Sequence, residues 1–154
     1  MEKIIIYFFL FISLIILIRW FNFPPFPKWL GLYLLSAFFS IIFAQILVGE
    51  YNFFTYPVRL LPDAFNISIV FDFFVFPIFN VFFFIVSEHS TFLKKVITCF
   101  IIVLPITISE KWAEVYTDLI EFHRWNILLS YFGSVLFVLG IHYLYLFLVS
   151  KNSF

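Results

Sequence analysis

The sequence is poor in charged residues and in glycine, and each shortage excludes a class of protein. Charged residues make up 12% of the 154 residues, about half the share of a typical soluble domain, whereas hydrophobic residues make up 64%. A chain this apolar cannot cover itself with water-compatible side chains, so lipid must be its solvent. With 4 glycines in all, the chain has no glycine-rich loop of the kind that cradles nucleotide phosphates.

The single cysteine and the balanced charge exclude further classes. Cys99 has no partner for an internal disulfide, and its apolar surroundings favour a buried hydrophobe over a reactive thiol. The formal net charge is zero, so no basic surface favours nucleic acid or anionic lipid as a partner. The zinc-protease, serine-hydrolase and phosphate-loop signatures do not occur. We therefore predict no enzymatic activity, no cofactor and no metal.

What the sequence does contain is a series of apolar runs, each long enough to cross a ~30 Å hydrocarbon core as a helix of roughly 20 residues. We predict an all-α integral membrane bundle of about five transmembrane helices. It forms one domain over residues 1–154, with spans at 4–23, 29–48, 63–87, 92–112 and 126–149. The first run lacks the small residues of a signal-peptide cleavage site, and we interpret it as a retained helix. An odd number of spans places the termini on opposite faces, and a slight excess of basic residues favours an external N-terminus.

Small residues predict where helices approach one another closely. Those in the second span lie along one side and are Gly31, Ser36, Ala37, Ser40 and Ala44. Gly133 and Gly140 in the last span predict a similar close contact.

The span at 63–87 carries the residue that is costliest to bury. If the helix begins at Asp63, whose carboxylate suits a helix N-terminus, Asp72 lies about 14 Å further along, near the bilayer midplane. A charge there costs roughly 2.5–3.5 kcal/mol on insertion scales. Pro77 should kink the helix and free a carbonyl that a neighbour must satisfy. Asn80 shares a face with Asp72, and so much polarity predicts a central position in the bundle.

Asp72 has two interpretations, and the sequence leaves both open. It is either part of an ion or proton site or a neutral carboxyl that is hydrogen-bonded to a neighbouring helix. His142, inside the last span, is the most plausible intramembrane partner. Asp72, Asn80 and His142 together are the candidate intramembrane polar site.

The strongly charged segment at 110–125 predicts a helical extension of the fourth span, followed by a tight loop. Its acidic residues recur at helical spacing and are Glu110, Glu114, Asp118 and Glu121. Such a face is more often solvated than metal-binding, even with His123 nearby. If Glu110 and His123 converged in one pocket, an enzyme acting on lipid would be indicated.

Three short motifs carry a resemblance to a known family: Phe74-Val75-Phe76-Pro77, Glu110-Lys111-Trp112 and Phe122-His123-Arg124-Trp125-Asn126. They resemble motifs of a family of small multi-spanning membrane proteins from Bacillus- and Clostridium-type bacteria. Lys111 interrupts the family's Glu-Trp step and Arg124 replaces its glycine, so the match is approximate. The resemblance covers the chain from about Tyr51 onward and implies the bacterial plasma membrane, without supplying an activity. It singles out Pro77, Glu110, Trp125 and Asn126.

The leading functional prediction is a non-enzymatic partner or scaffold in the bacterial cytoplasmic membrane, in contact with lipid and with another membrane protein. It rests on the small number of polar residues that converge. The alternative is a small transporter, or an ion- or proton-conducting subunit, built around Asp72, Asn80 and His142. A wet cavity beside Asp72 would favour transport, whereas a dry and fully bonded contact would favour the scaffold.

Overall fold

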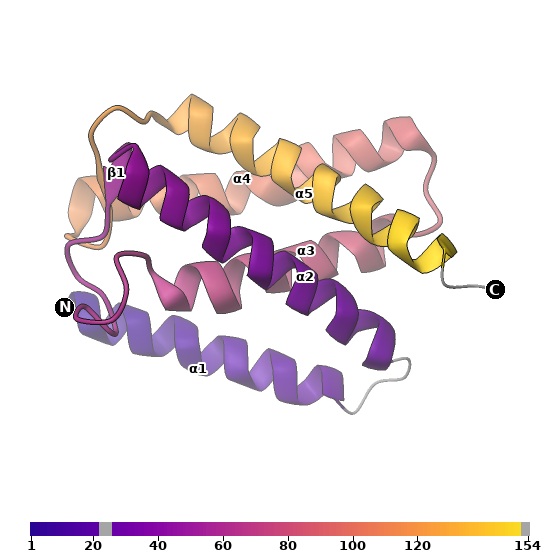
Figure 1. Cartoon of the computed structure of the whole chain (residues 1–154), viewed down its shortest axis with the longest axis horizontal. Coiled ribbons are helices and arrows are strands. Elements are labelled where there is room, and N and C mark those ends of the chain that lie inside the picture. The colour runs from indigo at the N-terminus through magenta and orange to yellow at the C-terminus, as the bar shows by residue number, and fades with distance from the viewer. Residues whose placement is uncertain (22–25, 152–154) are drawn as a thin grey trace.

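The chain folds into a helical bundle with a small β-ribbon at one end (Figure 1). A computed structural model describes residues 1–21 and 26–151. The helices are α1 (Glu2–Phe21), α2 (Phe26–Gln45), α3 (Phe76–Ser87), α4 (Phe92–Tyr116) and α5 (Ile127–Lys151), with π-helical segments η1 (Ile46–Glu50) and η2 (Val70–Val75). Within the described residues, five helical segments are long and apolar enough to cross a membrane. The predicted all-α bundle is confirmed.

The continuous helix formed by η2 and α3 occupies the centre of the bundle. α3 contacts α2, α4 and α5, and α2 and α5 lie side by side in front of it (Figure 1). This span has 56% of its residues buried within the protein, against 11% for α1. The predicted central position is therefore confirmed. The beginning of α1 and the end of α5 lie at opposite ends of the bundle, as an odd number of spans requires (Figure 1).

Four of the five small residues of α2 are buried, as the sequence predicted, whereas Gly31 is exposed. Ser36 and Ala37 are almost fully enclosed, and the main neighbour of α2 is α3. Small side chains let two backbones approach, which is how helices pack where lipid supplies no hydrophobic driving force. Larger side chains of α2 and α3 then form the core of this contact: Leu32, Tyr33, Ile78, Val81 and Phe84.

The carbonyl that Pro77 leaves free is satisfied by a neighbouring helix, also as predicted. Pro77 stands in the first turn of α3, directly after η2. In an α-helix, the N–H of this residue would bond to the carbonyl of Phe73, and proline has no N–H. The hydroxyl of Tyr33 on α2 donates to that carbonyl at 2.6 Å. At this position the helix changes from π- to α-helical register.

The prediction that the third span begins at Asp63 is wrong. Asp63 lies in an exposed turn, and the helical span begins at Val70. Arg59 donates to the backbone carbonyls of Asn66 and Pro62 instead of pairing with Asp63. The boundary was misplaced because Asp63 after Pro62 suits a helix start and apolar Phe65, Ile67 and Ile69 follow it, although these residues fold as irregular chain.

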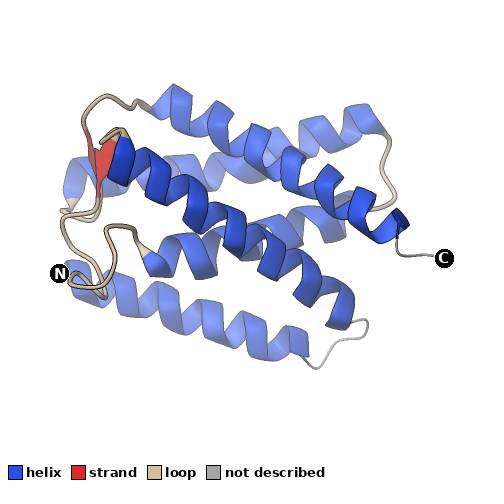
Figure 2. Cartoon of the chain, in the orientation of Figure 1, coloured by secondary structure: helices blue, strands red, loops and turns tan. Residues whose placement is uncertain are grey.

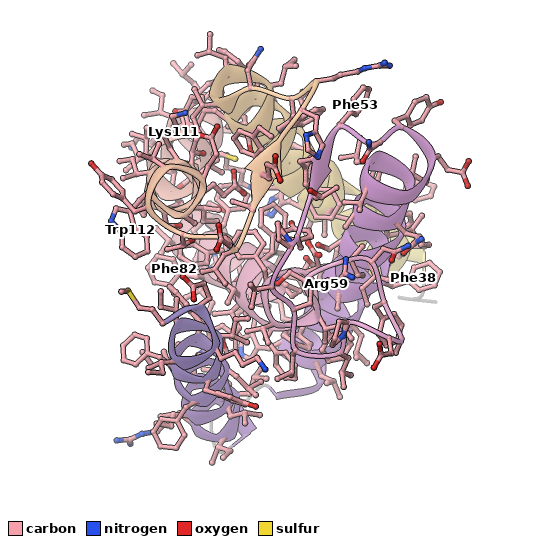
Figure 3. All side chains as sticks on the ribbon, turned by 90° about the vertical axis from the view of Figure 1, so that its left-hand side faces the viewer. Phe38, Phe53, Arg59, Phe82, Lys111 and Trp112 are labelled. Atoms are coloured by element: carbon pink, nitrogen blue, oxygen red, sulfur yellow. The ribbon has the colours of Figure 1, made fainter. Side chains whose placement is uncertain are left out.

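Two loops form a layer over this end of the bundle, which we call the cap and define as residues 51–69 and 117–126. β1 (Phe54–Thr55) in the first loop pairs antiparallel with β2 (Glu121–Phe122) in the second (Figure 2). Beneath the ribbon lies a buried cluster of Ala44, Val48, Phe54, Tyr56, Ile67 and Ile120. Figure 3 looks onto the cap, with Phe53 and Arg59 in its loop and α1 standing to one side. Apolar side chains thus close the end of the bundle.

The four-residue acidic face is not formed. α4 does extend to Tyr116, as predicted, but Asp118 and Glu121 lie in the cap, outside any helix. Glu114 pairs with Lys111, whose side chain points away from the bundle in Figure 3. Glu110 differs from the other three acidic residues because its side chain faces the interior of the bundle.

Candidate functional site

Asp72 is buried under the cap, and one of its oxygens has no partner. It is the third residue of η2, and its side chain is 6% exposed. One carboxylate oxygen accepts a hydrogen bond from the backbone of Ser68 in the cap, two residues before η2 begins. The other, Oδ2, has no hydrogen-bond partner. Because η2 begins at the capped end of the bundle, the predicted position of Asp72 in the middle of its span is wrong; the cap, rather than depth in the bilayer, buries it.

Glu110 approaches the same place from α4. Its carboxylate accepts a hydrogen bond from the hydroxyl of Ser130 on α5. Glu110 and Asp72 line one cavity and lie close enough to interact electrostatically. Consecutive antiparallel spans explain the pairing, because the end of α4 and the beginning of η2 lie at the same end of the bundle. The alternation of spans puts both residues at one end, but only the observed start of the helical span at Val70 brings Asp72 to the level of Glu110 instead of His142.

The main cavity lies between α2 and α5, with the two carboxylates at its inner end. Its volume is about 560 Å³. Aromatic side chains make up much of its lining: Phe39, Phe43, Phe54, Tyr56, Phe71, Phe76, Phe122, Trp125 and Phe137. None of the described residues that line it is Lys, Arg or His. The cavity is thus an aromatic chamber with two acidic groups and no basic one.

Gly133 and Gly140 border this cavity, so the close packing predicted for them is wrong. A Cβ atom added at Gly140 would meet nothing within 4 Å, and one added at Gly133 would meet only the ring of Trp125, at 3.8 Å. At these two positions α5 carries no side chain and faces the cavity rather than a neighbouring helix.

Tyr56 of the cap lies beside both carboxylates. Burial raises the pKa of the Tyr56 phenol well above its usual value, and the charges of Asp72 and Glu110 raise it further. The phenol therefore keeps its proton at physiological pH, and the cap presents a neutral hydroxyl to the acidic pair.

A smaller side cavity of about 110 Å³ lies beyond this group, toward α1. Four residues line both cavities: Tyr56, Phe71, Glu110 and Ile120. They form the partition between the two spaces. Glu110 is therefore accessible from either side of the partition.

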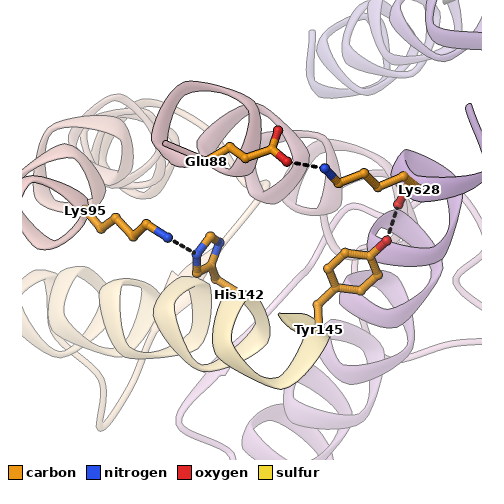
Figure 4. Close-up of polar contacts among 5 residues, drawn as sticks. All are labelled: Lys28, Glu88, Lys95, His142 and Tyr145. Carbon is orange, nitrogen blue, oxygen red and sulfur yellow. Dashed lines mark hydrogen bonds and ion pairs between the residues drawn. The ribbon is translucent and has the colours of Figure 1, made fainter. Parts of the chain in front are cut away.

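His142 and Asn80 are not brought together with Asp72. His142 lies at the other end of the bundle, between the rings of Phe83 and Phe84, with its Nε2 3.2 Å from Nζ of Lys95 (Figure 4). Asn80 donates to the backbone carbonyl of Phe76 within its own helix. The predicted polar site of three residues is therefore not assembled. A 100° helical projection places residues on a face, but it does not say how far apart along the axis their partners lie.

Lys28, Glu88 and Tyr145 share that other end with His142. Lys28 pairs with Glu88, and the hydroxyl of Tyr145 donates to the Lys28 carbonyl at 2.8 Å (Figure 4). The ammonium of Lys28 also lies over the ring of Phe84, 5.1 Å from its centre. These contacts tie α2, α3 and α5 together where the cap is absent.

The remaining predicted residues have structural positions around the cap. Trp125 lines the main cavity and contacts the rings of Phe53 and Phe54. Asn126 accepts from the N–H of Leu129 at 2.9 Å and so caps the beginning of α5. His123 contacts the hydroxyl of Thr55 on the exposed face of the ribbon, at 3.1 Å. It does not line the cavity, so the convergence of Glu110 with His123 is not seen.

No protein family, curated protein or solved structure matches the chain. The resemblance to a bacterial membrane family thus stays a prediction. Among the described residues, no three His, Cys, Asp or Glu side chains are placed to hold a metal ion. What the geometry offers is a pair of carboxylates with free acceptor capacity, in an apolar chamber with no cation of its own.

Proposed function

We propose that the protein is a small carrier of cations in the plasma membrane of a bacterium, with Asp72 and Glu110 as its cation-binding pair. The observation that carries the proposal is the main cavity, in which a buried Asp72 oxygen has no partner. A scaffold has no use for such a chamber, whereas a carrier requires one. The scaffold remains the weaker prediction for that reason.

The energetics of the acidic pair favour a mobile positive charge. Ionisable groups inside a membrane protein are expensive, and they commonly mark ion pathways or proton relays. Two carboxylates in an apolar site are stabilised by a cation or by protons, and the lining residues supply no cation. Cation and proton therefore compete for the same oxygens. Such competition couples the movement of one to the opposite movement of the other.

The partition between the two cavities favours transport over binding alone. Glu110 lines both spaces, so an ion that it holds is in reach of either. Tyr56, Phe71 and Ile120 also line both spaces and lie between them. Tyr56 and Ile120 are buried, so opening the partition requires these side chains to repack, a slower step than rotation of exposed side chains.

The test is cation–proton exchange in liposomes. The purified protein is reconstituted with a pH-sensitive dye inside, and the external probes are sodium, potassium and quaternary alkylammonium ions, which cannot cross as a neutral base. We expect at least one probe to drive protons out faster than in protein-free liposomes. Asp72→Asn and Glu110→Gln should abolish the exchange, whereas Glu114→Gln on the outer face of α4 and Asp118→Asn in the cap should leave it intact. Exchange at the protein-free rate for every probe, or exchange unaffected at Asp72 and Glu110, would refute the carrier.

A further inference from the structure

Building on the proposed carrier, we infer that its substrate is an amphiphilic amine, an ammonium group on an apolar body, which enters the main cavity sideways from the bilayer between α2 and α5. Three features of the cavity lead to this ligand class: its acidic inner end, its aromatic walls and its lipid-facing rim.

The inner end suits an ammonium better than a metal ion or a lipid phosphate. Asp72 Oδ2 is free to accept, and Glu110 accepts one bond from Ser130, so the pair retains acceptor sites for the N–H donors of an ammonium. Calcium takes six to eight oxygen ligands, and two carboxylates fall short of that set. A zwitterionic headgroup would bring a phosphate with it, and no described basic residue lines the cavity to receive one.

The walls suit an apolar body. A cavity of about 560 Å³ lies within the size range of small-molecule sites, which are mostly apolar with a few convergent polar groups. Cations also favour aromatic faces, which is how aromatic cages recognise quaternary ammonium ligands. The rings of Phe71 and Phe76 beside Asp72, and of Phe43 and Phe137 nearer the rim, extend this preference along the cavity.

The rim faces lipid rather than water. Phe43 on α2 and Leu136 on α5 line the cavity and are 50% and 72% exposed on the outside of two membrane-spanning helices. Gly140 on α5 leaves its part of the wall open. A hydrated inorganic ion would have to shed its water at this apolar mouth, whereas an amphiphilic amine is already dissolved in the bilayer.

Binding in nanodiscs tests the ligand class directly. The probe is an undecylammonium with a dansyl group on its far end, and its twin is the undecanoate of the same length and fluorophore, so the two differ only in charge. The discs contain phosphatidylcholine and phosphatidylglycerol, and binding is followed by energy transfer from tryptophan, including Trp125 in the cavity wall. We expect saturable binding of the ammonium probe, about tenfold or more tighter than binding of its twin, because charge-assisted hydrogen bonds are lost with the ammonium.

Three variants locate the bound probe. Asp72→Asn should weaken binding by about tenfold or more while leaving the shape of the site unchanged. Gly140→Leu adds a side chain whose Cβ would meet nothing within 4 Å, and it should weaken binding by filling the cavity. Leu128→Phe, on the exposed outer face of α5 and outside the cavity, should leave binding unchanged. A monodisperse elution of each disc, with unchanged helical circular dichroism, shows that the variants are folded.

Two outcomes overturn the inference. If the twins bind equally and the variants have no effect, the probe merely partitions into lipid. If added phosphatidylethanolamine displaces the probe, the ammonium ligand of the site is a lipid headgroup rather than a free amine.

Failure of the inferred ligand class can be distinguished from failure of the proposed carrier by comparing the binding test with the exchange test. Exchange of sodium or potassium in liposomes without preferential binding of the ammonium probe would refute the inferred substrate class and support the carrier. Asp72-dependent binding of the ammonium probe without exchange of any cation would support the inferred ligand class and refute the carrier.

Discussion

Removing the hydroxyl of Tyr33 should destabilise the bundle measurably, because that hydroxyl donates to a carbonyl that Pro77, having no N–H, cannot serve. Tyr33 is 6% exposed, and its hydroxyl donates to Phe73 at 2.6 Å, at the position where Pro77 provides no N–H. A neutral hydrogen bond contributes a net ~0.5–1.5 kcal/mol in proteins, and interhelical bonds in a membrane protein average about 0.6 with a maximum near 1.7. Since Tyr33→Phe removes a donor that Pro77 cannot replace, we expect the upper half of that range, about 1–1.5 kcal/mol.

Tyr145→Phe is the matched control for this substitution. It also removes an interhelical hydroxyl that donates to a backbone carbonyl, that of Lys28. Lys28 lies inside α2, however, where the N–H four residues later also bonds its carbonyl. Tyr145→Phe should therefore cost less, about 0.5 kcal/mol.

The assay is unfolding by sodium dodecyl sulfate in mixed micelles, followed by tryptophan fluorescence and by circular dichroism. The decisive comparison is a double-mutant cycle, because Pro77→Ala restores an N–H for the Phe73 carbonyl. In that background Tyr33→Phe should lose about 0.5–1 kcal/mol of its effect. An equal cost of Tyr33→Phe with and without Pro77, or no cost at all, would show that the hydroxyl does not complete the helix at this proline.

Two further predictions concern the core. Phe83 is fully buried, whereas its neighbour Phe82 is 49% exposed. Phe83→Ala should therefore lower the free energy of unfolding by about 2–3 kcal/mol in the same titration, and Phe82→Ala by less than about 1 kcal/mol. Similar losses for the two variants would contradict the observed packing. Cys99 is fully buried, with its thiol against the carbonyl of Val135, so a maleimide should label it only after unfolding. Rapid labelling in mild detergent would place Cys99 on the surface instead.

Properties of single helices were predictable from the sequence. The apolar runs became helices because a backbone in lipid must satisfy its own hydrogen bonds. The central position of the third span followed from its polar content, and the need for a donor at Pro77 followed from the missing N–H. Each of these inferences depends on one segment at a time.

The predictions that failed depend on relations between segments. Asp63 suits a helix start and apolar residues follow it in the cap loop, so it was wrongly placed at the beginning of the span. Gly133 and Gly140 were expected to admit a helix, and they border a cavity instead. Spacing identifies which residues share a face, but not whether that face meets another helix or open space.

The amino-acid order by itself determined that this protein consists of apolar helices with a carboxylate in the third of them, since hydropathy and proline chemistry act locally. Tertiary structure alone decided that Asp72 meets Glu110 rather than His142, and that the cap closes over them. The reason is geometric: antiparallel packing sets the axial level at which side chains from different helices meet, and no local property of the chain encodes that level.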